Sequence, residues 1–217
     1  MTRVPFTQNY RWHLPLLLLV FCCSFFINNG AIFADIMESR NIITAREMVY
    51  DHNWLVPTMN GELRLEKPPL PTWIAAITEM ISPDNLPLQR AMAGFAAVML
   101  VLFFYKFATK LTDNRTYALV SSLVLCTSYN IILMGRTATW DIYCHAFMMG
   151  AIYYLYLALR QNPCKWIYFI GAGIFMGLSF LGKGPVSFYA LLLPFVCAYI
   201  LYSVSYTHLT LPTTPYV

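Results

Sequence analysis

Charge is what this sequence has least of. Only 11% of its 217 residues are Asp, Glu, Lys or Arg, and 59% are hydrophobic. An ordinary soluble domain carries about 25% charged residues. So little charge cannot cover a surface exposed to water, which excludes a soluble enzyme and a disordered tail protein. Most of the surface is therefore expected to face lipid rather than water, and the composition predicts a membrane protein.

Three further features are missing from the sequence. The six cysteines form no C-x-x-C pair, so neither a zinc finger nor a disulfide framework is indicated, and we interpret them as small apolar fillers. The 14 Lys and Arg residues are scattered rather than clustered, so no nucleic-acid partner is expected. The internal repeats that mark many transporters are also absent from the sequence.

Apolar runs of near-membrane length are what the sequence does contain. They cover Leu14–Ala34, Ala91–Phe107, Tyr117–Met134, Ile142–Leu159, Trp166–Gly182 and Val186–Ser203. A membrane helix needs about 20 mostly apolar residues. We therefore predict an all-α, polytopic membrane helix bundle with about six transmembrane helices. The first run exceeds the apolar core of a signal peptide, so we expect a retained helix.

The distribution of basic residues suggests an orientation. With the N-terminus in the cytoplasm, the 14 Lys and Arg divide seven and seven, which is a tie under the positive-inside rule. Five of the outer seven, however, belong to one long segment, residues 35–90, and the short inner loops are almost purely basic. We therefore expect a cytoplasmic N-terminus and a structured outer loop over residues 35–90.

Two interfacial helices are predicted inside this outer loop. Asp35 to Tyr50 mixes apolar and charged residues as an amphipathic helix does. A cluster of prolines then breaks the backbone, and Thr72 to Met80 suits a second short helix anchored by Trp73.

The end of the sequence differs in character from the rest. Residues 204–217 carry no charge, and they look like the translation of a transposon adapter used in DNA sequencing. We therefore expect residues 1–203 to be the N-terminal part of a longer membrane domain, with residues 204–217 as a non-native tail.

Acids and bases gather at the outer ends of the predicted helices. They are Asp35, Glu38, Glu66, Lys67, Arg136, Asp141 and Lys183. Ionisable groups at membrane depth are usually functional or paired, so the pattern predicts one polar cavity at the outer surface. Simpler explanations exist for single residues: Asp35 could mark the end of the first helix, Asp141 could favour the dipole of the helix that it starts, and Lys183 could reach the interface. For His145, a buried hydrogen-bonded side chain is favoured over a metal ligand.

Several motifs resemble those of a known family. They are Ala-Arg-Glu-Met at residues 45–48, Asn-Trp-Leu-Val-Pro at 53–57, Asn-Gly at 60–61, Glu-Lys-Pro-Pro-Leu at 66–70, Arg-Thr-Ala-Thr-Trp-Asp at 136–141 and Gly-Leu-Ser-Phe-Leu-Gly-Lys-Gly-Pro at 177–185. Together they resemble the polyprenyl-phosphate-sugar-dependent glycosyltransferases of the GT-C fold. This superfamily includes the lipid A aminoarabinose transferase and, more distantly, the protein O-mannosyltransferases.

The resemblance implies roles for acidic residues. The family carries a catalytic acid just after the first helix, usually within an Asp-Glu pair. Glu38 matches the second acid of the pair, Met37 replaces the first, and Asp35 stands two residues earlier, so the choice between Asp35 and Glu38 stays open. Asp141 matches a further acid of the same cavity. Glu66 matches a carboxylate that is associated with a divalent metal ion in the aminoarabinose transferase. The histidine that binds the same metal there comes from a later part of the chain, which this sequence does not contain.

The resemblance also implies which cations hold the donor. Lys67 matches the lysine that contacts the lipid phosphate, and Lys183 matches a base of the cavity. Together with Arg136 they would bind the phosphate and stabilise the charge that grows as the glycosidic bond breaks.

The implied activity is inverting transfer of a sugar from a polyprenyl phosphate of the undecaprenyl type. The acceptor is a lipid such as lipid A, a glycan or a protein, at the outer face of the bacterial cytoplasmic (inner) membrane. Two alternatives remain: a transporter or flippase for lipid-linked sugars, with the same cations binding a head group, and a non-catalytic assembly subunit.

Overall fold

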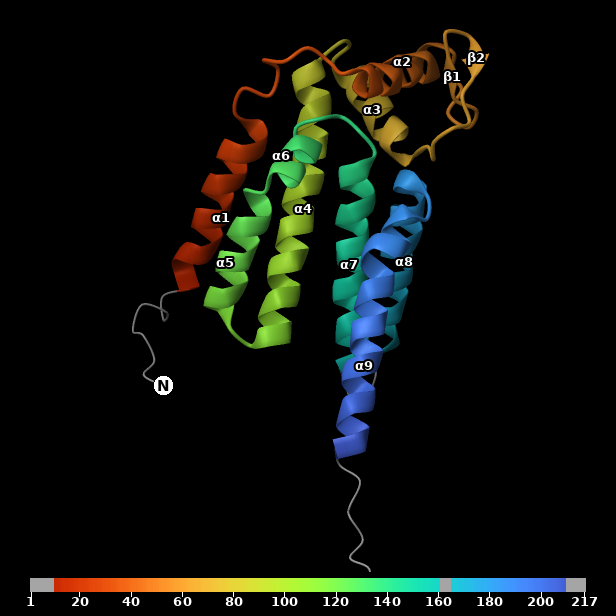
Figure 1. Cartoon of the computed structure of the whole chain (residues 1–217). Helices are drawn as coiled ribbons and strands as arrows, with labels where there is room; N and C mark the ends of the chain where they lie inside the picture. Colours follow the sequence, from red (N-terminus) through yellow and green to blue (C-terminus); the bar gives the residue numbers. More distant parts are fainter. Residues whose placement is uncertain (1–9, 161–164, 210–217) are drawn as a thin grey trace, which may run out of the picture.

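A computed structural model describes residues 10–160 and 165–209, and in these ranges the protein is a helix bundle with a cap across one end (Figure 1). A 3-10 turn, η2 (Tyr10–Trp12), leads into the bundle. The bundle consists of α1 (His13–Phe21), η3 (Cys22–Phe26), α4 (Leu86–Thr112), α5 (Arg115–Cys126), α6 (Tyr129–Gly135), α7 (Asp141–Arg160), α8 (Trp166–Lys183), η4 (Phe188–Leu192) and α9 (Leu193–Leu209). The all-α architecture predicted from the sequence is confirmed.

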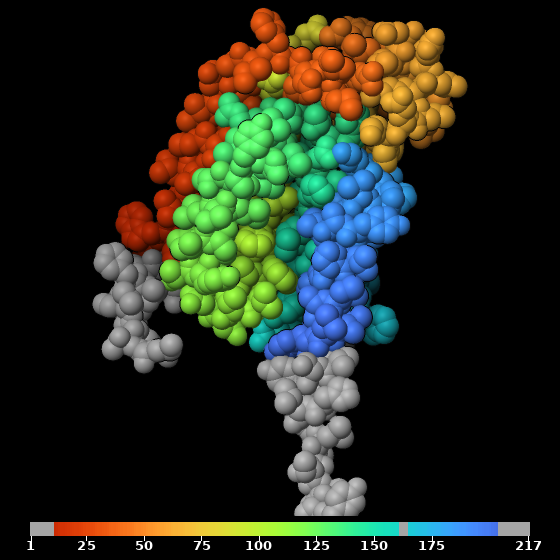
Figure 2. Space-filling view, in the orientation of Figure 1, coloured from red at the N-terminus to blue at the C-terminus, as the bar shows by residue number. Residues whose placement is uncertain are grey.

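The cap is the predicted outer loop. It contains α2 (Ile36–Tyr50), β1 (Thr58–Met59), β2 (Glu62–Leu63) and α3 (Leu70–Ile81). The strands form an antiparallel hairpin with Thr58 opposite Leu63, and its turn residues Asn60 and Gly61 both have positive φ, which suits an Asn-Gly turn. Both predicted interfacial helices are therefore present, and the space-filling view shows the cap covering the end of the bundle (Figure 2).

Three helices are long and apolar enough to cross a membrane: α4, α7 and α8. The pair α5 and α6 passes the same test together, but it bends by 66° at residues 127–128. The hydroxyls of Thr127 and Ser128 bond to backbone carbonyls of the preceding turn, which explains a break at this point. The protein is thus a multi-pass membrane protein with three or four such spans in its described residues. The remaining two predicted runs correspond to shorter apolar helices, His13–Phe26 and Phe188–Ser203.

Two boundaries differ from the sequence prediction. The first helix was expected to reach Ala34, but it ends at Phe26, because Asn28 adopts a left-handed φ of 54° and the chain turns there. At the other end, α9 stays helical to Leu209, so the expected end of the helix at Ser203 is wrong. Residues 210–217 of the predicted non-native tail lie outside the described residues.

The helices alternate in direction, which determines where their ends lie. The chain enters α4 and α7 at the cap and leaves η3, α6 and α8 there (Figure 1). Small residues allow the helices to approach closely. A Cβ atom on Gly182 would lie only 3.1 Å from the Cα of Cys144, so glycine suits the close approach of α8 to α7 at this position. All predicted site residues consequently belong to the cap or to helix ends beside it.

Candidate functional site

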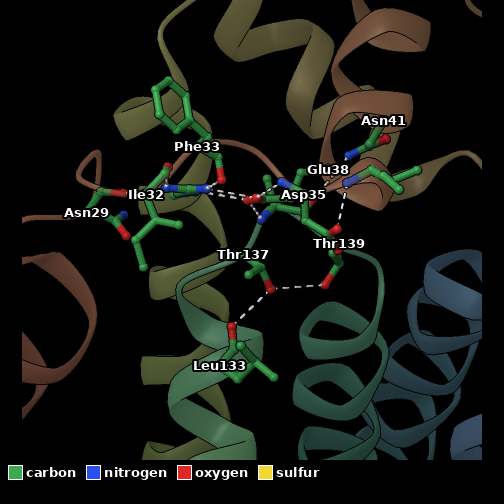
Figure 3. Close-up of polar contacts among 12 residues, drawn as sticks. Asn29, Ile32, Phe33, Asp35, Glu38, Asn41, Leu133, Thr137 and Thr139 are labelled. Carbon is green, nitrogen blue, oxygen red and sulfur yellow. Dashed lines mark hydrogen bonds and ion pairs between the residues drawn. The ribbon is translucent and has the colours of Figure 1, made fainter.

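Glu38 forms the centre of a buried polar cluster under the cap (Figure 3). The side chain is only 1% exposed. Its Oε1 accepts hydrogen bonds from Arg90 Nε at 2.9 Å and from the backbone N–H of Ala138 at 2.7 Å. Its Oε2 accepts from Arg90 Nη2 at 2.8 Å and from the Asp35 backbone N–H at 3.1 Å. The carboxylate therefore joins three segments that lie far apart in the sequence.

Arg90, at the first turns of α4, completes this cluster. Besides Glu38 it donates to the backbone carbonyls of Asn29 and Ile32, both at 2.9 Å, and of Phe33 at 3.4 Å. These carbonyls belong to the connection between the first helix and α2. Burial acts to raise the pKa of Glu38, but the hydrogen bonds from Arg90, Ala138 and Asp35 outweigh it and hold the pKa below the ordinary value. Glu38 is therefore an ionised, saturated acceptor.

Asp35 is placed differently, although it stands only three residues earlier. It is the N-cap of α2, and its Oδ1 accepts from the Ile36 backbone N–H at 2.6 Å. Together with Glu38 it forms a capping box, in which each side chain binds the other's backbone N–H. The side chain of Asp35 is exposed, whereas that of Glu38 is enclosed. Asp35 is thus the acid of the pair with oxygen atoms open to another molecule.

Arg136 lies between α6 and α7 and binds the end of the first helix. Its Nη1 donates to the carbonyl of Ser24 at 3.0 Å, and its Nη2 donates to those of Ile27 and Asn28 at 2.9 and 3.2 Å. Helix C-termini leave carbonyls without partners, and this guanidinium satisfies them. In this arrangement Arg136 holds the backbone, and a role in binding phosphate stays a prediction.

Asp141 and Lys183 form an ion pair at the cap end of α7 and α8. Asp141 is the first residue of α7 and Lys183 the last of α8, and their side chains are 29% and 25% exposed. The close approach of the helices at Gly182 places the lysine within reach of the acid. Residues 42 positions apart thus meet, and the pair is open enough to accept a ligand.

Two contacts from α2 place Ala138 in the loop that leads into Asp141. The backbone N–H of Ala138 donates to Glu38, and its carbonyl accepts from Asn41 Nδ2 at 3.2 Å. Asn41 Oδ1 in turn accepts from Thr72 Oγ1 at 2.9 Å. The acid-bearing starts of α2 and α7 are therefore held together by hydrogen bonds inside the cap.

Glu66 and Lys67 lie in the loop between β2 and α3. Glu66 is exposed and Lys67 half-buried. The indole N–H of Trp73 donates to the carbonyl of Trp54 at 2.8 Å, which ties the start of α3 to the connection between α2 and β1. The loop that carries Lys67 leads directly into α3, and α3 contacts α8.

The described residues do not form a complete site for a divalent metal, and the association of Glu66 with a metal ion stays a prediction. Among the described residues no group of three or more His, Cys, Asp or Glu side chains is arranged to hold a metal ion. Glu66 offers one exposed carboxylate, and Nδ1 of His145 lies 3.2 Å from the hydroxyl of Ser187. We therefore derive no step through a metal ion.

Several residues that build the site were not singled out from the sequence: Arg64, Arg90, Asn41 and Trp140. A basic residue at the start of a long apolar helix was the only available signal for Arg90. The other three look like ordinary loop or helix residues, and only the contacts of the folded chain distinguish them.

The fold and the polar cluster together define a polytopic membrane protein of the GT-C type. A sequence profile of the dolichyl-phosphate-mannose-protein mannosyltransferase family matches residues 66–217. The chain belongs to this family.

Individual relatives agree with this assignment. The chain is 32% identical over 165 residues to the undecaprenyl phosphate-alpha-4-amino-4-deoxy-L-arabinose arabinosyl transferase of Shewanella sediminis, covering 73% of this chain and 29% of the relative. It is 26% identical over 193 residues to undecaprenyl phosphate-alpha-4-amino-4-deoxy-L-arabinose arabinosyl transferase 1 of Proteus mirabilis, and the match covers 88% of this chain and 34% of the relative. The chain thus spans about a third of the length of these curated relatives.

A solved structure has the same fold. The crystal structure of ArnT from Cupriavidus metallidurans bound to undecaprenyl phosphate matches with a TM-score of 0.70 over 91% of this chain and 36% of that chain. The sequence identity is 16%, so this similarity concerns the fold. The apo structure of the same protein matches with a TM-score of 0.69.

Proposed function

We propose that this chain is the N-terminal part of a membrane glycosyltransferase that uses a polyprenyl phosphate sugar of the undecaprenyl type as donor. The observation that carries the proposal is the arrangement at the cap. An exposed acid, Asp35, lies at the same end of the bundle as Lys67 and the half-exposed Asp141–Lys183 pair. Acids and ammonium groups at one membrane surface suit a substrate with a lipid tail and a phosphate.

Each residue has a defined task in the proposed reaction. The bond between the anomeric carbon and the phosphate oxygen breaks, and the phosphate leaves with the electron pair. Lys67 and Lys183 neutralise its growing charge, and Asp141 keeps Lys183 oriented. The acceptor attacks the anomeric carbon from the opposite face, so the configuration inverts. Asp35 orients the attacking group and takes its proton.

The choice of Asp35 over Glu38 follows from their surroundings. All four acceptor contacts of Glu38 are intramolecular, and its side chain is 1% exposed. A carboxylate in this state has no free oxygen for a substrate. Asp35 is exposed, and its side chain accepts only from backbone N–H groups of the first turn of α2, those of Ile36 and Glu38, so it can receive a proton from an acceptor molecule.

The proposed site faces the outer side of a bacterial cytoplasmic membrane, with a cytoplasmic N-terminus. Support comes from the opposite end of the bundle, where several basic residues gather: Lys106, Lys110, Arg115, Arg160 and Lys165. Basic residues are typical of cytoplasmic loops. The names of the relatives support an undecaprenyl phosphate donor. The acceptor class, a lipid such as lipid A, another glycan or a protein, is part of the proposal.

The test uses the full-length protein in liposomes with a polyprenyl phosphate sugar and a candidate acceptor, and mass spectrometry of the products. Wild-type protein should form a new sugar–acceptor bond. Asp35→Asn should lower kcat by about 100-fold or more, as loss of a general base does. Lys67→Ala should abolish transfer, and Lys106→Ala, at the opposite end, should leave it unchanged.

Two results would contradict the proposal. Sugar that changes sides of the membrane without a new bond would indicate a transporter. Unchanged kcat in Asp35→Asn, in a protein that inserts normally, would remove Asp35 from the reaction.

A further inference from the structure

Arg64 is a buried arginine that forms no salt bridge within the described residues. It follows β2 and is 8% exposed. Its Nη1 donates to the carbonyl of Arg40 at 2.6 Å and to the hydroxyl of Thr44 at 2.8 Å, both on α2. Within the described ranges, these are its side-chain acceptors, and no carboxylate forms an ion pair with it. Nε and Nη2 are therefore donors without an acceptor.

Trp140 lies directly beside this guanidinium. The Cζ of Arg64 is 5.4 Å from the centroid of the Trp140 ring, a cation–π distance. Trp140 is 3% exposed, and its indole N–H is buried without a hydrogen-bond partner. A buried polar group without a partner costs about 1–3 kcal/mol, so such groups are rare unless something else binds them.

The unpaired groups at this place are all donors. Arg64 provides two N–H positions and a permanent positive charge, and Trp140 provides one N–H. A ligand that satisfies them has to bring acceptors and negative charge. Phosphate has both, and arginine binds it with two parallel hydrogen bonds.

The place also adjoins the proposed donor site. Arg64 precedes Lys67 by three residues in the same loop, and Trp140 precedes Asp141, which pairs with Lys183. The two chain segments that carry the cations of the donor site therefore meet where Arg64 contacts Trp140.

We propose that Arg64 and the indole N–H of Trp140 form a phosphate-binding subsite that completes the donor site of Lys67 and Lys183. The subsite rests on the proposed function and adds two phosphate contacts to it. Arg64 acts in two ways: Nη1 fastens the loop to α2, while Nε and Nη2 bind phosphate oxygens. Trp140 holds the guanidinium plane through its ring and donates its N–H to the same phosphate.

The experiment measures binding of undecaprenyl phosphate to the full-length protein, with undecaprenol as the ligand without phosphate and inorganic phosphate as competitor. Arg64→Lys keeps the positive charge and one donor for α2 but loses the planar fork. We expect its Kd for the lipid phosphate to rise about ten-fold or more, as loss of a charge-assisted hydrogen bond does. Trp140→Phe keeps the ring and should raise this Kd by a smaller factor. Undecaprenol binding should stay unchanged in both variants.

Two substitutions provide matched controls. Arg46→Lys changes an arginine whose guanidinium pairs with Asp84, and Trp166→Phe changes an exposed tryptophan at the start of α8, at the end of the bundle opposite the cap. Neither should alter binding of the lipid phosphate. If inorganic phosphate competes with the lipid, the subsite recognises the phosphate group itself. If it does not compete, the subsite recognises phosphate only when it is attached to the lipid.

The outcomes separate this subsite from the proposed function. If wild-type protein does not bind undecaprenyl phosphate, the proposed donor is wrong. If wild-type protein binds and both Trp140→Phe and a folded Arg64→Lys bind equally well, the subsite does not exist while the donor assignment stands. Equal losses for undecaprenol and for the phosphate would indicate a purely structural role and would also overturn the inference.

Discussion

The guanidinium of Arg90 binds both carboxylate oxygens of Glu38, with Nε 2.9 Å from Oε1 and Nη2 2.8 Å from Oε2. The two residues are 52 positions apart, and both are almost fully buried. Their pair fixes the connection after the first helix, the start of α2 and the loop before α7. The position of Asp35 therefore depends on this salt bridge, because the Asp35 backbone N–H donates a hydrogen bond to the Glu38 carboxylate.

Breaking this pair should destabilise the protein strongly. Glu38→Ala leaves the Arg90 charge buried without its partner, and removal of one member of a buried pair costs about 3–5 kcal/mol. Thermal unfolding of the full-length protein in detergent measures the effect. Asp113→Asn is the matched control, because the pair of Asp113 with Arg160 is exposed to water and should contribute little to stability. Equal unfolding midpoints for wild type and Glu38→Ala would contradict this interpretation of the cluster.

The same pair predicts a pH dependence. The pKa of Glu38 is lowered from 4.5 in the folded protein, so the ionised form stabilises the fold above pH 4.5. This contribution is lost as the pH falls through the lowered pKa. The stability difference between wild type and Glu38→Gln should be constant from pH 7 to about 5 and shrink at lower pH. Unfolding midpoints across this range test it, and a difference independent of pH down to 3 would exclude Glu38 as the responsible group.

Gly182→Ala should separate α7 and α8. The added methyl would meet the backbone of Cys144 at 3.1 Å, and backbone atoms cannot move aside as a flexible side chain does. We expect a loss of stability of about 1–3 kcal/mol, typical of overpacking. Lower sugar transfer should accompany it, since Lys183 follows directly. Gly173→Ala is the control, because nothing lies within 4 Å of its added carbon. A variant at Gly182 as stable as that control would show that the helices can accommodate the methyl.

Arg136→Gln should loosen the end of the first helix. Three backbone carbonyls lose a charged donor, and because the contacts with Ile27 and Asn28 are exposed to water we expect a cost of only about 1 kcal/mol. Hydrogen exchange of the backbone amides in residues 22–30 should become faster, while exchange in α8 stays unchanged. If exchange is unaltered but binding of undecaprenyl phosphate is weaker, Arg136 binds the phosphate of the donor, as predicted from the sequence.

Asp141 and Lys183 should act as a unit. Lys183→Met removes a phosphate-binding cation and leaves Asp141 half-exposed without its partner, so the KM for the lipid-linked donor should rise about ten-fold or more. Adding Asp141→Asn to this variant should change KM by less than the single substitution does in wild-type protein. Transfer kinetics of the four proteins form a double-mutant cycle. Strict additivity would indicate that the two residues contribute independently.

The sequence alone predicted most of the architecture, because helix formation and membrane insertion depend on local hydrophobicity. All six apolar runs contain helices, and both interfacial helices of the cap are present. Alternation of helices across a bilayer also predicted that Asp35, Asp141 and Lys183 would share one end of the bundle. These predictions needed only run lengths, loop composition and connectivity.

The contacts of the site could not be obtained in this way. Whether Glu38 or Asp35 is open to a substrate depends on Arg90. The 52 positions between Arg90 and Glu38 in the sequence do not indicate that their side chains meet in the folded protein. The early end of the first helix follows from Asn28 and from carbonyls that Arg136 binds across more than 100 residues.

Composition and hydropathy thus determined that this chain enters a membrane as helices and presents its acids and bases at one surface. Tertiary structure decided which of those groups bind each other and which stay available. Glu38 is buried and Arg136 binds backbone carbonyls, whereas the Asp35 carboxylate stays exposed while it caps α2, and the outer nitrogens of Arg64 have no acceptor among the described residues. The physical reason is that burial and hydrogen-bond saturation arise where distant segments pack together, and no local pattern encodes that packing.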